Sequence, residues 1–167
     1  TKNPTVPTLS PTTSPTVTTV RYVWLIKPND FTMNIAEIQV FDTLSANIAL
    51  GQPVYATSTL SSNYGSNLVD GITTNFAHTT SQTGGLAGWW IDFGSQIPLS
   101  DIDNIVIVNR NVEGQRAIGA TVFLTADNPN SIATPDTNNG PTLGTKIWES
   151  AAISTNDATY TFYPNTP

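Results

Sequence analysis

Short runs of β-branched and aromatic residues, each ended by Pro, Gly, Asn or Asp, recur along the chain. Residues 20–26 are Val-Arg-Tyr-Val-Trp-Leu-Ile and end at a Lys-Pro-Asn-Asp turn. Residues 35–41 alternate Glu and Gln with Ile and Val. Alternation with a period of two predicts half-buried strands, and the turn residues between the runs predict antiparallel connections. No stretch has a convincing helical period, so the pattern favours an all-β protein.

The spacing of about eight such runs predicts an antiparallel jelly-roll β-sandwich. The expected strands are residues 20–26, 35–41, 54–58, 88–93, 102–109, 117–125, 145–149 and 158–163. Residues 88–93 and 102–109 are apolar on both sides of the alternation, as interior strands are. Because successive side chains of a strand point to opposite faces, the adjacent Trp89 and Trp90 must face different sides of their sheet.

The segment 1–19 differs from the rest, because Pro, Thr and Ser dominate it. This composition predicts an extended linker, followed by one sandwich domain over residues 20–167. Ser/Thr tracts with Pro are typical of O-glycosylated stalks, although an unmodified spacer has the same composition. We therefore expect an extracellular, cell-surface or virion-surface location.

Composition excludes several functions. The net charge is -6 with only six Lys and Arg, which argues against nucleic acid as a partner. Without Cys there is no disulfide, thiolate metal site or cysteine nucleophile. No apolar run reaches the roughly 20 residues that span a bilayer. With one His and no Gly-x-Ser-x-Gly motif, and with no acidic residue distinguished from turn and strand-end carboxylates, we expect a non-enzyme.

A polar loop at residues 64–80 has the oxygen-rich character of a calcium site. Its Asp70-Gly71 pair predicts a tight turn that folds the loop back and directs carbonyl groups inward. Asp70, Thr80 and the carbonyl groups around Asn67 and Ile72 would supply hard oxygen ligands. An ordinary polar turn explains the same residues without a metal.

Arg110 and Arg116 flank a short polar loop and are the candidate ligand-binding residues. Two forked guanidinium groups suit the vicinal hydroxyls of a sugar or a carboxylate, and nearby aromatic rings suit the apolar face of a sugar. Alternatively, one arginine forms an ordinary surface ion pair with Glu113 or Asp92. His78, the only imidazole, is expected to satisfy a local hydrogen bond.

Several segments resemble the discoidin or coagulation-factor type C domain, and within that family the fucolectin branch. These segments are residues 67–71, 75–78, 89–94, 108–110 and 116–120, within a similarity that extends over about residues 20–163. Residues 51–58 resemble the family's opening strand and residues 35–40 its closing strand, so the chain resembles a circularly permuted member. The resemblance implies a galactose-binding-like jelly roll.

Fucolectins carry a structural calcium ion, and the resemblance implies its ligands in this chain. They are the carbonyl oxygens of Asn67, Ile72 and Ala36, the side chains of Asp70 and Glu37, and Thr80, where the family has Ser. Glu37 is distant from Asp70 in sequence, and the spacing of the residues alone does not link the two.

The resemblance also matches Arg110 and Arg116 to the family's two fucose-binding arginines, although the loop between them is one residue shorter. The family's adjacent Cys pair is missing, and its sugar-binding His falls near Thr83, whereas His78 matches another position. The resemblance therefore implies a sugar site without fixing the sugar.

Two functions remain open. The first is a non-catalytic, calcium-stabilised carbohydrate-binding module of a secreted or surface glycoprotein, with a glycan or glycoprotein as its partner. The second is a structural or adhesion module that packs with copies of itself or with other extracellular structural proteins in a filament, wall or virion. In that case the sugar site is altered or lost. An ordered structure of residues 1–19 would favour this second function.

Overall fold

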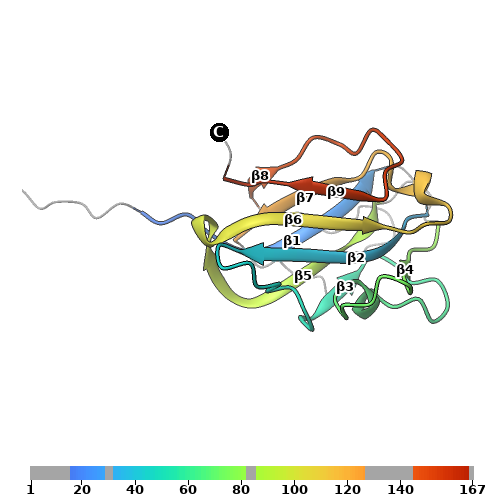
Figure 1. Ribbon diagram of the computed structural model, residues 1–167, viewed down its shortest axis with the longest axis horizontal. Helices are drawn as coiled ribbons and strands as arrows, with labels where there is room; N and C mark the ends of the chain where they lie inside the picture. The colour runs from blue at the N-terminus through green and yellow to red at the C-terminus, as the bar shows by residue number, and fades with distance from the viewer. Residues whose placement is uncertain (1–15, 29–31, 82–85, 127–144, 166–167) are drawn as a thin grey trace, which may run out of the picture.

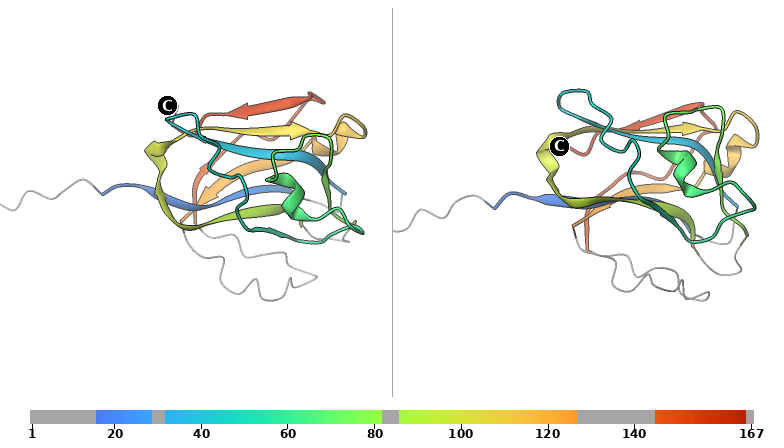
Figure 2. Two further views of the ribbon diagram at one scale, coloured as in Figure 1. Left: turned by 60° about the horizontal axis from the view of Figure 1, so that its bottom comes forward. Right: turned by 90° about the horizontal axis from the view of Figure 1, so that it is seen from below.

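The computed structural model describes residues 16–28, 32–81, 86–126 and 145–165. Two antiparallel sheets pack face to face, and the views in Figures 1 and 2 show them as two layers. The predicted antiparallel β-sandwich is therefore confirmed. The expected linker falls largely on residues 1–15, which lie outside the described residues.

One sheet has five strands and the other four. The order in the first is β3 (Val54–Ala56), β5 (Leu86–Pro98), β1 (Thr19–Pro28), β7 (Thr121–Thr125) and β8 (Lys146–Glu149). The order in the second is β4 (Ala77–His78), β2 (Asn34–Asp42), β6 (Ile102–Asn109) and β9 (Thr159–Phe162). Three short 3-10 segments are η1 (Gly65–Leu68), η2 (Leu99–Asp101) and η3 (Gly114–Ala117). As predicted from their apolar sequences, β5 and β6 are interior strands of their sheets.

Two details of the strand prediction are wrong. The two-residue strand β4 was not predicted, because it is too short to show a period. Residues 117–120 were predicted as the start of a strand, but Ala117 ends η3 and β7 begins only at Thr121. Ala117 and Ala120 are both buried, which produces a strand-like apolar pattern in a segment that turns at Gly119, where φ is +88°.

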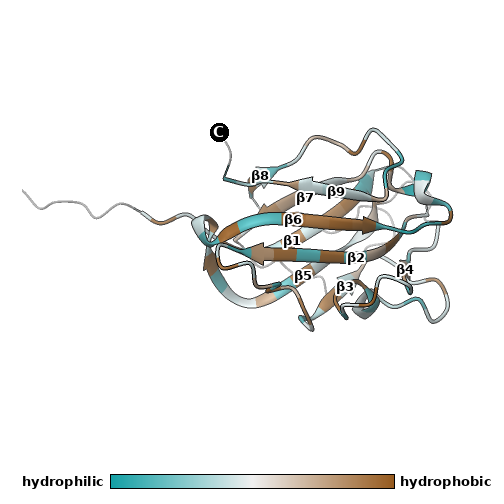
Figure 3. Ribbon diagram, in the orientation of Figure 1, coloured by the Kyte–Doolittle hydropathy of each residue, from teal (hydrophilic) through white to brown (hydrophobic). Residues whose placement is uncertain are grey.

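The core lies between the two sheets. It is formed by inward side chains such as Leu25 of β1, Ile38 of β2, Trp89 of β5 and Ile107 of β6, all almost fully buried. Figure 3 shows polar and apolar residues alternating along β2 and a continuous apolar run in the second half of β6. Each large apolar side chain buried in this way contributes roughly 1.5–3 kcal/mol.

A second apolar cluster lies on the other face of the five-stranded sheet. Trp90 stacks on Trp24 at 5.1 Å between ring centres, and Trp24 stacks on Phe123 at 5.5 Å. Tyr55 stacks on the other side of Trp90 at 5.6 Å. Since Trp89 belongs to the core between the sheets, the prediction that the two adjacent tryptophans face opposite sides is confirmed.

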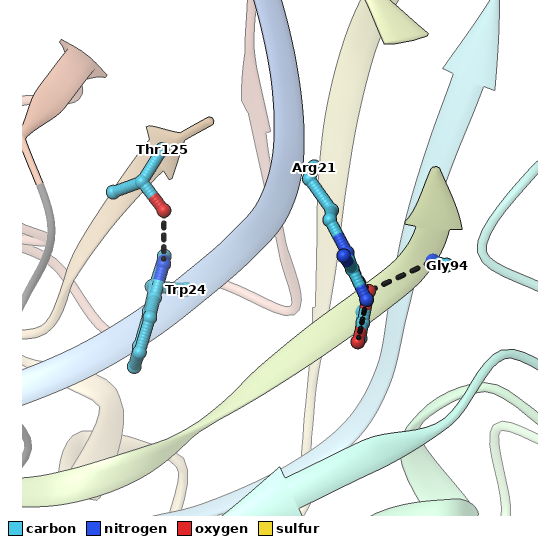
Figure 4. A network of polar contacts seen from close by, with 5 residues as sticks. Arg21, Trp24, Gly94 and Thr125 are labelled. Carbon is cyan, nitrogen blue, oxygen red and sulfur yellow. Dashed lines mark hydrogen bonds and ion pairs between the residues drawn. The ribbon is translucent and has the colours of Figure 1, made fainter. Parts of the chain in front are cut away.

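Polar contacts also tie the strands of this sheet together, as Figure 4 shows. Trp24 Nε1 donates a hydrogen bond to Thr125 Oγ1 at 3.1 Å. Arg21 donates two hydrogen bonds to the Asp92 carboxylate, at 2.7 and 2.9 Å, and Gly94 N donates a third at 2.8 Å. Burial raises the pKa of Asp92, but these hydrogen bonds outweigh burial and hold the pKa below its usual value.

The start of β2, the end of β6, β4 and η3 lie at one end of the sandwich, on the right in Figure 1, and η1 packs against β2 and β4. Antiparallel pairing explains this arrangement. Asn34 pairs with His78, and Ile35 pairs with Asn109 at the end of β6. The candidate metal loop and the arginine loop are therefore neighbours in space, although they are far apart in sequence.

Candidate functional site

Glu37 lies at a β-bulge in β2. Ile35 pairs with Asn109 and Glu37 with Val108, so Ala36 is the extra residue on its strand. The Glu37 side chain is fully buried, and its Oε1 accepts a hydrogen bond from Gly71 N at 2.9 Å. The structure thus brings Glu37 to the Asp70-Gly71 turn.

The turn itself has the predicted form. Gly71 has a φ of +78°, a backbone conformation that residues with a Cβ adopt only with strain. Asp70 Oδ1 accepts a hydrogen bond from Ile72 N at 2.8 Å, and Asp70 Oδ2 accepts one from Asn75 Nδ2 at 2.7 Å. The Asp70 carboxylate therefore organises the loop locally, and each of its oxygens keeps lone pairs for a further contact.

The electrostatics of this region are unfavourable for a second negative charge. Burial, chiefly, and the nearby Asp70 carboxylate raise the pKa of Glu37 to about 7, although the Gly71 hydrogen bond opposes the shift. Within the described residues, Glu37 Oε2 is buried and has no hydrogen-bond partner. A buried carboxylate oxygen without a partner is costly, and a divalent cation is the kind of group that would remove that cost.

The remaining candidate metal ligands are of the right type for calcium, which binds carboxylate, carbonyl and hydroxyl oxygens. Asn67 and Ile72 lie on either side of Asp70, and Ala36 precedes Glu37. Thr80 is held by Ser58: its backbone N–H donates to Ser58 Oγ at 3.0 Å, and its carbonyl accepts from the same hydroxyl at 3.3 Å. The described residues contain no cluster of three or more His, Cys, Asp or Glu side chains, and this proposed set needs only two carboxylates. The types of donor atom in this set are those that calcium binds.

The two candidate arginines converge on a single short segment. The Arg110 guanidinium carbon lies 3.7 Å from the centre of the Phe76 ring. Arg116 Nη1 donates to His78 Nε2 at 3.0 Å, and Arg116 Nη2 lies 3.3 Å from Glu113 Oε2. Both arginines remain partly exposed. The expected surface ion pair thus exists for Arg116 with Glu113.

Asp92 was the alternative partner expected for one of the two candidate arginines. Its carboxylate instead forms an ion pair with Arg21 on the other sheet.

Two hydrogen bonds involve the ring nitrogens of His78, and only one of them was expected. Its Nδ1 lies 2.6 Å from the Thr79 carbonyl oxygen, which is the predicted local hydrogen bond. Arginine can only donate, so Nε2 must accept from Arg116, and Nδ1 carries the proton donated to Thr79. The contact with Arg116 makes His78 a member of the arginine cluster. No local pattern indicates this contact, because it depends on the pairing of β4 with β2.

Asn34 is a further polar residue that the sequence did not single out. Its side chain is fully buried, and neither Nδ2 nor Oδ1 has a hydrogen-bond partner in the part of the chain that the structure describes. Asn34 pairs directly with His78, and side chains directly opposite one another share a face of the sheet. An amide with unused donors and an unused acceptor therefore lies beside the arginine cluster.

Asn109 fixes the loop that carries the two arginines. Its side chain is almost fully buried, and Nδ2 is 3.0 Å from the Gly114 carbonyl oxygen, 2.9 Å from that of Asp157 and 3.1 Å from the Tyr160 hydroxyl. These contacts join the end of β6 to η3 and to the chain before β9. Glu113, which precedes η3, has a left-handed conformation with a φ of 61°.

Comparison of the chain with protein-family models, with curated proteins and with solved structures gave no match. The resemblance to the discoidin family therefore rests on the sequence segments given above. Within the described residues, no helix has the length and apolar character needed to cross a membrane.

Proposed function

We propose that this chain is a non-catalytic carbohydrate-binding module whose ligand site is formed by Arg110, Arg116 and the residues that they contact. The observation that carries the proposal is the convergence of both arginines on Phe76 and His78. Two guanidinium groups that are partly exposed and contact the same short segment are suited to binding the oxygen atoms of a polar ligand.

The charge of the cluster favours hydroxyl groups over a carboxylate. Arg116 is already paired with the Glu113 carboxylate, so a ligand carboxylate would have to compete with a neighbouring negative charge. A hydroxyl group both accepts and donates, so it can bind Arg116 and Glu113 at once. Vicinal hydroxyls of a neutral sugar match this pair of groups.

Exposed apolar side chains near the cluster support sugar binding as well. Val112, in the arginine loop, is 54% exposed. Tyr64 is 59% exposed and follows Asn63, whose carbonyl accepts a hydrogen bond from His78 N at 3.2 Å. A sugar presents an apolar ring face besides its hydroxyls, and side chains of this kind would cover that face.

We also propose that the scaffold binds a structural calcium ion. Glu37 and Asp70 would provide the carboxylates, the backbone at Ala36, Asn67 and Ile72 the carbonyl oxygens, and Thr80 a further oxygen. The ion would supply positive charge between two carboxylates that are close together and would join the loop to β2. The unpartnered Glu37 Oε2 supports this assignment.

The relationship to the discoidin family, with its fucolectin branch and circular permutation, belongs to the same proposal, as does the location. We propose a secreted or cell-surface protein with a glycan or glycoprotein as its partner. These parts rest on the resemblance and on the composition of residues 1–19.

A glycan array followed by calorimetry tests the proposal. The wild-type protein should bind at least one neutral glycan, and Arg110→Ala or Arg116→Ala should weaken that binding by about tenfold or more, as expected for a residue that directly contacts the ligand. Arg21→Ala is the matched control, because Arg21 forms its ion pair with Asp92 on the other sheet. Absence of glycan binding, or an equal loss in the control, would refute the proposal; self-association without glycan binding would favour an adhesion module.

A further inference from the structure

The candidate metal loop is directly bonded to the segment beneath the arginines. Asn67 Nδ2 donates a hydrogen bond to the Phe76 carbonyl oxygen at 2.9 Å. Asn75, the residue before Phe76, donates through Nδ2 to Asp70 Oδ2 at 2.7 Å. Two side-chain contacts therefore join residues 67–70 to residues 75–76.

The same segment carries the contacts to both arginines. The Phe76 ring lies under the Arg110 guanidinium, and two residues later the His78 imidazole accepts from Arg116. A shift of residues 75–78 would therefore move the supports of both arginines together. The hydrogen bonds from Asn67 and Asn75 fix the position of this segment relative to the loop.

A second connection runs through β2. Glu37 contacts the loop at Gly71, and Asn34, at the start of the same strand, pairs with His78. Ile35 pairs with Asn109, which immediately precedes Arg110. These contacts connect β2 to the loop and to both parts of the arginine cluster.

We infer that Asn67 is a positioning residue that couples the cation site to the arginine cluster. The conformation that a cation imposes on residues 67–72 sets the position of Phe76 and hence of Arg110. A cation in the loop thereby prepares the ligand site, and by linkage a bound ligand tightens cation binding by the same factor. This inference rests on the proposed calcium and ligand sites and names how the first regulates the second. A coupling of about tenfold in affinity lies within the usual range for such linked sites.

Calcium titration followed by NMR of the arginine side chains tests the coupling without any sugar. Because Arg110 lies 3.7 Å above an aromatic ring, its Nε–H signal depends strongly on its position over that ring. Adding calcium to chelator-treated wild-type protein should shift this signal. The proposed ligand atom of residue 67 is the backbone carbonyl, so Asn67→Ala should still bind calcium, measured by calorimetry, while the Arg110 signal no longer follows.

Two further variants complete the experiment. Asn67→Leu, which keeps the approximate size of the side chain and adds no charge but cannot donate to Phe76, should behave like Asn67→Ala. Asn63→Ala is the matched control, because among the described residues the Asn63 side chain bonds only to the nearby Leu60 carbonyl, at 3.2 Å, and it should behave like the wild type.

The outcomes separate the inference from the functions on which it rests. Calcium binding that leaves the Arg110 signal of the wild-type protein unmoved would overturn the coupling alone. Asn67→Ala behaving like Asn63→Ala would do the same. A wild-type protein that binds no calcium would overturn both the metal proposal and the coupling. A glycan array that detects no binding would refute the proposed carbohydrate ligand but would not affect the NMR test of the coupling.

Discussion

Glu37 Oε1 accepts a hydrogen bond from the backbone N–H of Gly71 at 2.9 Å, across 34 positions of the sequence. The other carboxylate oxygen of Glu37 is buried without a partner among the described residues, and Asp70 lies next to Gly71. One carboxyl group thus joins β2 to a distant loop, and its protonation and its access to a cation should both control stability.

The first prediction concerns pH in the absence of metal. The folded-state pKa of Glu37 is raised from 4.5 to about 7, so the unfolded chain releases the proton first as pH rises. The free energy of unfolding should therefore fall between pH 4.5 and 7 and level off above, by on the order of 3 kcal/mol for this group. Urea unfolding in chelator at several pH values measures this slope.

Glu37→Gln isolates the contribution of this carboxyl group, because glutamine cannot ionise. Below pH 4.5 Glu37 is protonated in both states, so the free energy of unfolding of the variant should be close to that of the wild type. Above pH 7 the wild type has lost stability, so the variant should be the more stable protein. A difference that does not depend on pH would show that Glu37 titrates normally in the folded protein.

The second prediction concerns calcium. A cation that binds only the folded state adds about 2.7 kcal/mol at a hundredfold excess over its dissociation constant. For a domain of this size, the melting temperature should rise by about 5–10 °C at neutral pH, and a chelator should reverse the rise. Asp70→Asn should abolish the effect, whereas Asp103→Asn, an exposed carboxylate of β6, should retain it. Equal calcium responses in both variants would remove Asp70 from the site.

The third prediction concerns the arginine loop. Asn109→Ala removes the donors that reach the carbonyl groups of Gly114 and Asp157, and leaves these acceptors without that partner. Unfolding free energy should drop by about 2–3 kcal/mol, and amide exchange in residues 110–117 should accelerate more than elsewhere. Asn104→Ala on the same strand, whose amide nitrogen bonds to Asp103, is the control and should cost little. Uniform acceleration across the chain would argue against a local role.

The strands could be predicted because the pattern of apolar residues that marks each strand lies within a few consecutive positions. The run at residues 88–93 and the alternation at residues 35–41 each show a period within a few positions, and the opposite placement of Trp89 and Trp90 follows from that period alone. The Asp70-Gly71 turn is equally local. In contrast, β4 has two residues and therefore no period to detect.

The contacts that assemble the candidate site are not local. Arg110 and Arg116 are close in sequence, so spacing could pair them. The approach of His78 to Arg116 depends instead on strands β4, β2 and β6 lying side by side. The contact between Glu37 and the metal loop is of the same kind, and only the family resemblance led to it. Nothing in the sequence marked Asn34 as part of the site, because a polar residue at the start of a strand usually marks a turn.

The fourth prediction concerns Asn34, whose buried amide lacks a partner in the described part of the chain. A buried polar group without a hydrogen bond costs about 1–3 kcal/mol, whereas an apolar side chain of similar size pays no such penalty and suits a strand. Asn34→Val should therefore raise the free energy of unfolding by about 1 kcal/mol, measured by urea denaturation.

Asn47→Val provides the matched control for this substitution. Asn47 Oδ1 accepts hydrogen bonds from Val40 N at 3.1 Å and Ala49 N at 3.2 Å, so the same replacement there should destabilise the protein. The Asn34 side chain is fully buried but pairs with His78 beside the arginine cluster, so we expect it to affect ligand binding through the position of His78. Asn34→Val should then be more stable and bind glycan more weakly. Destabilisation equal to that of Asn47→Val would instead mean that the Asn34 amide is satisfied, for example by a buried water molecule.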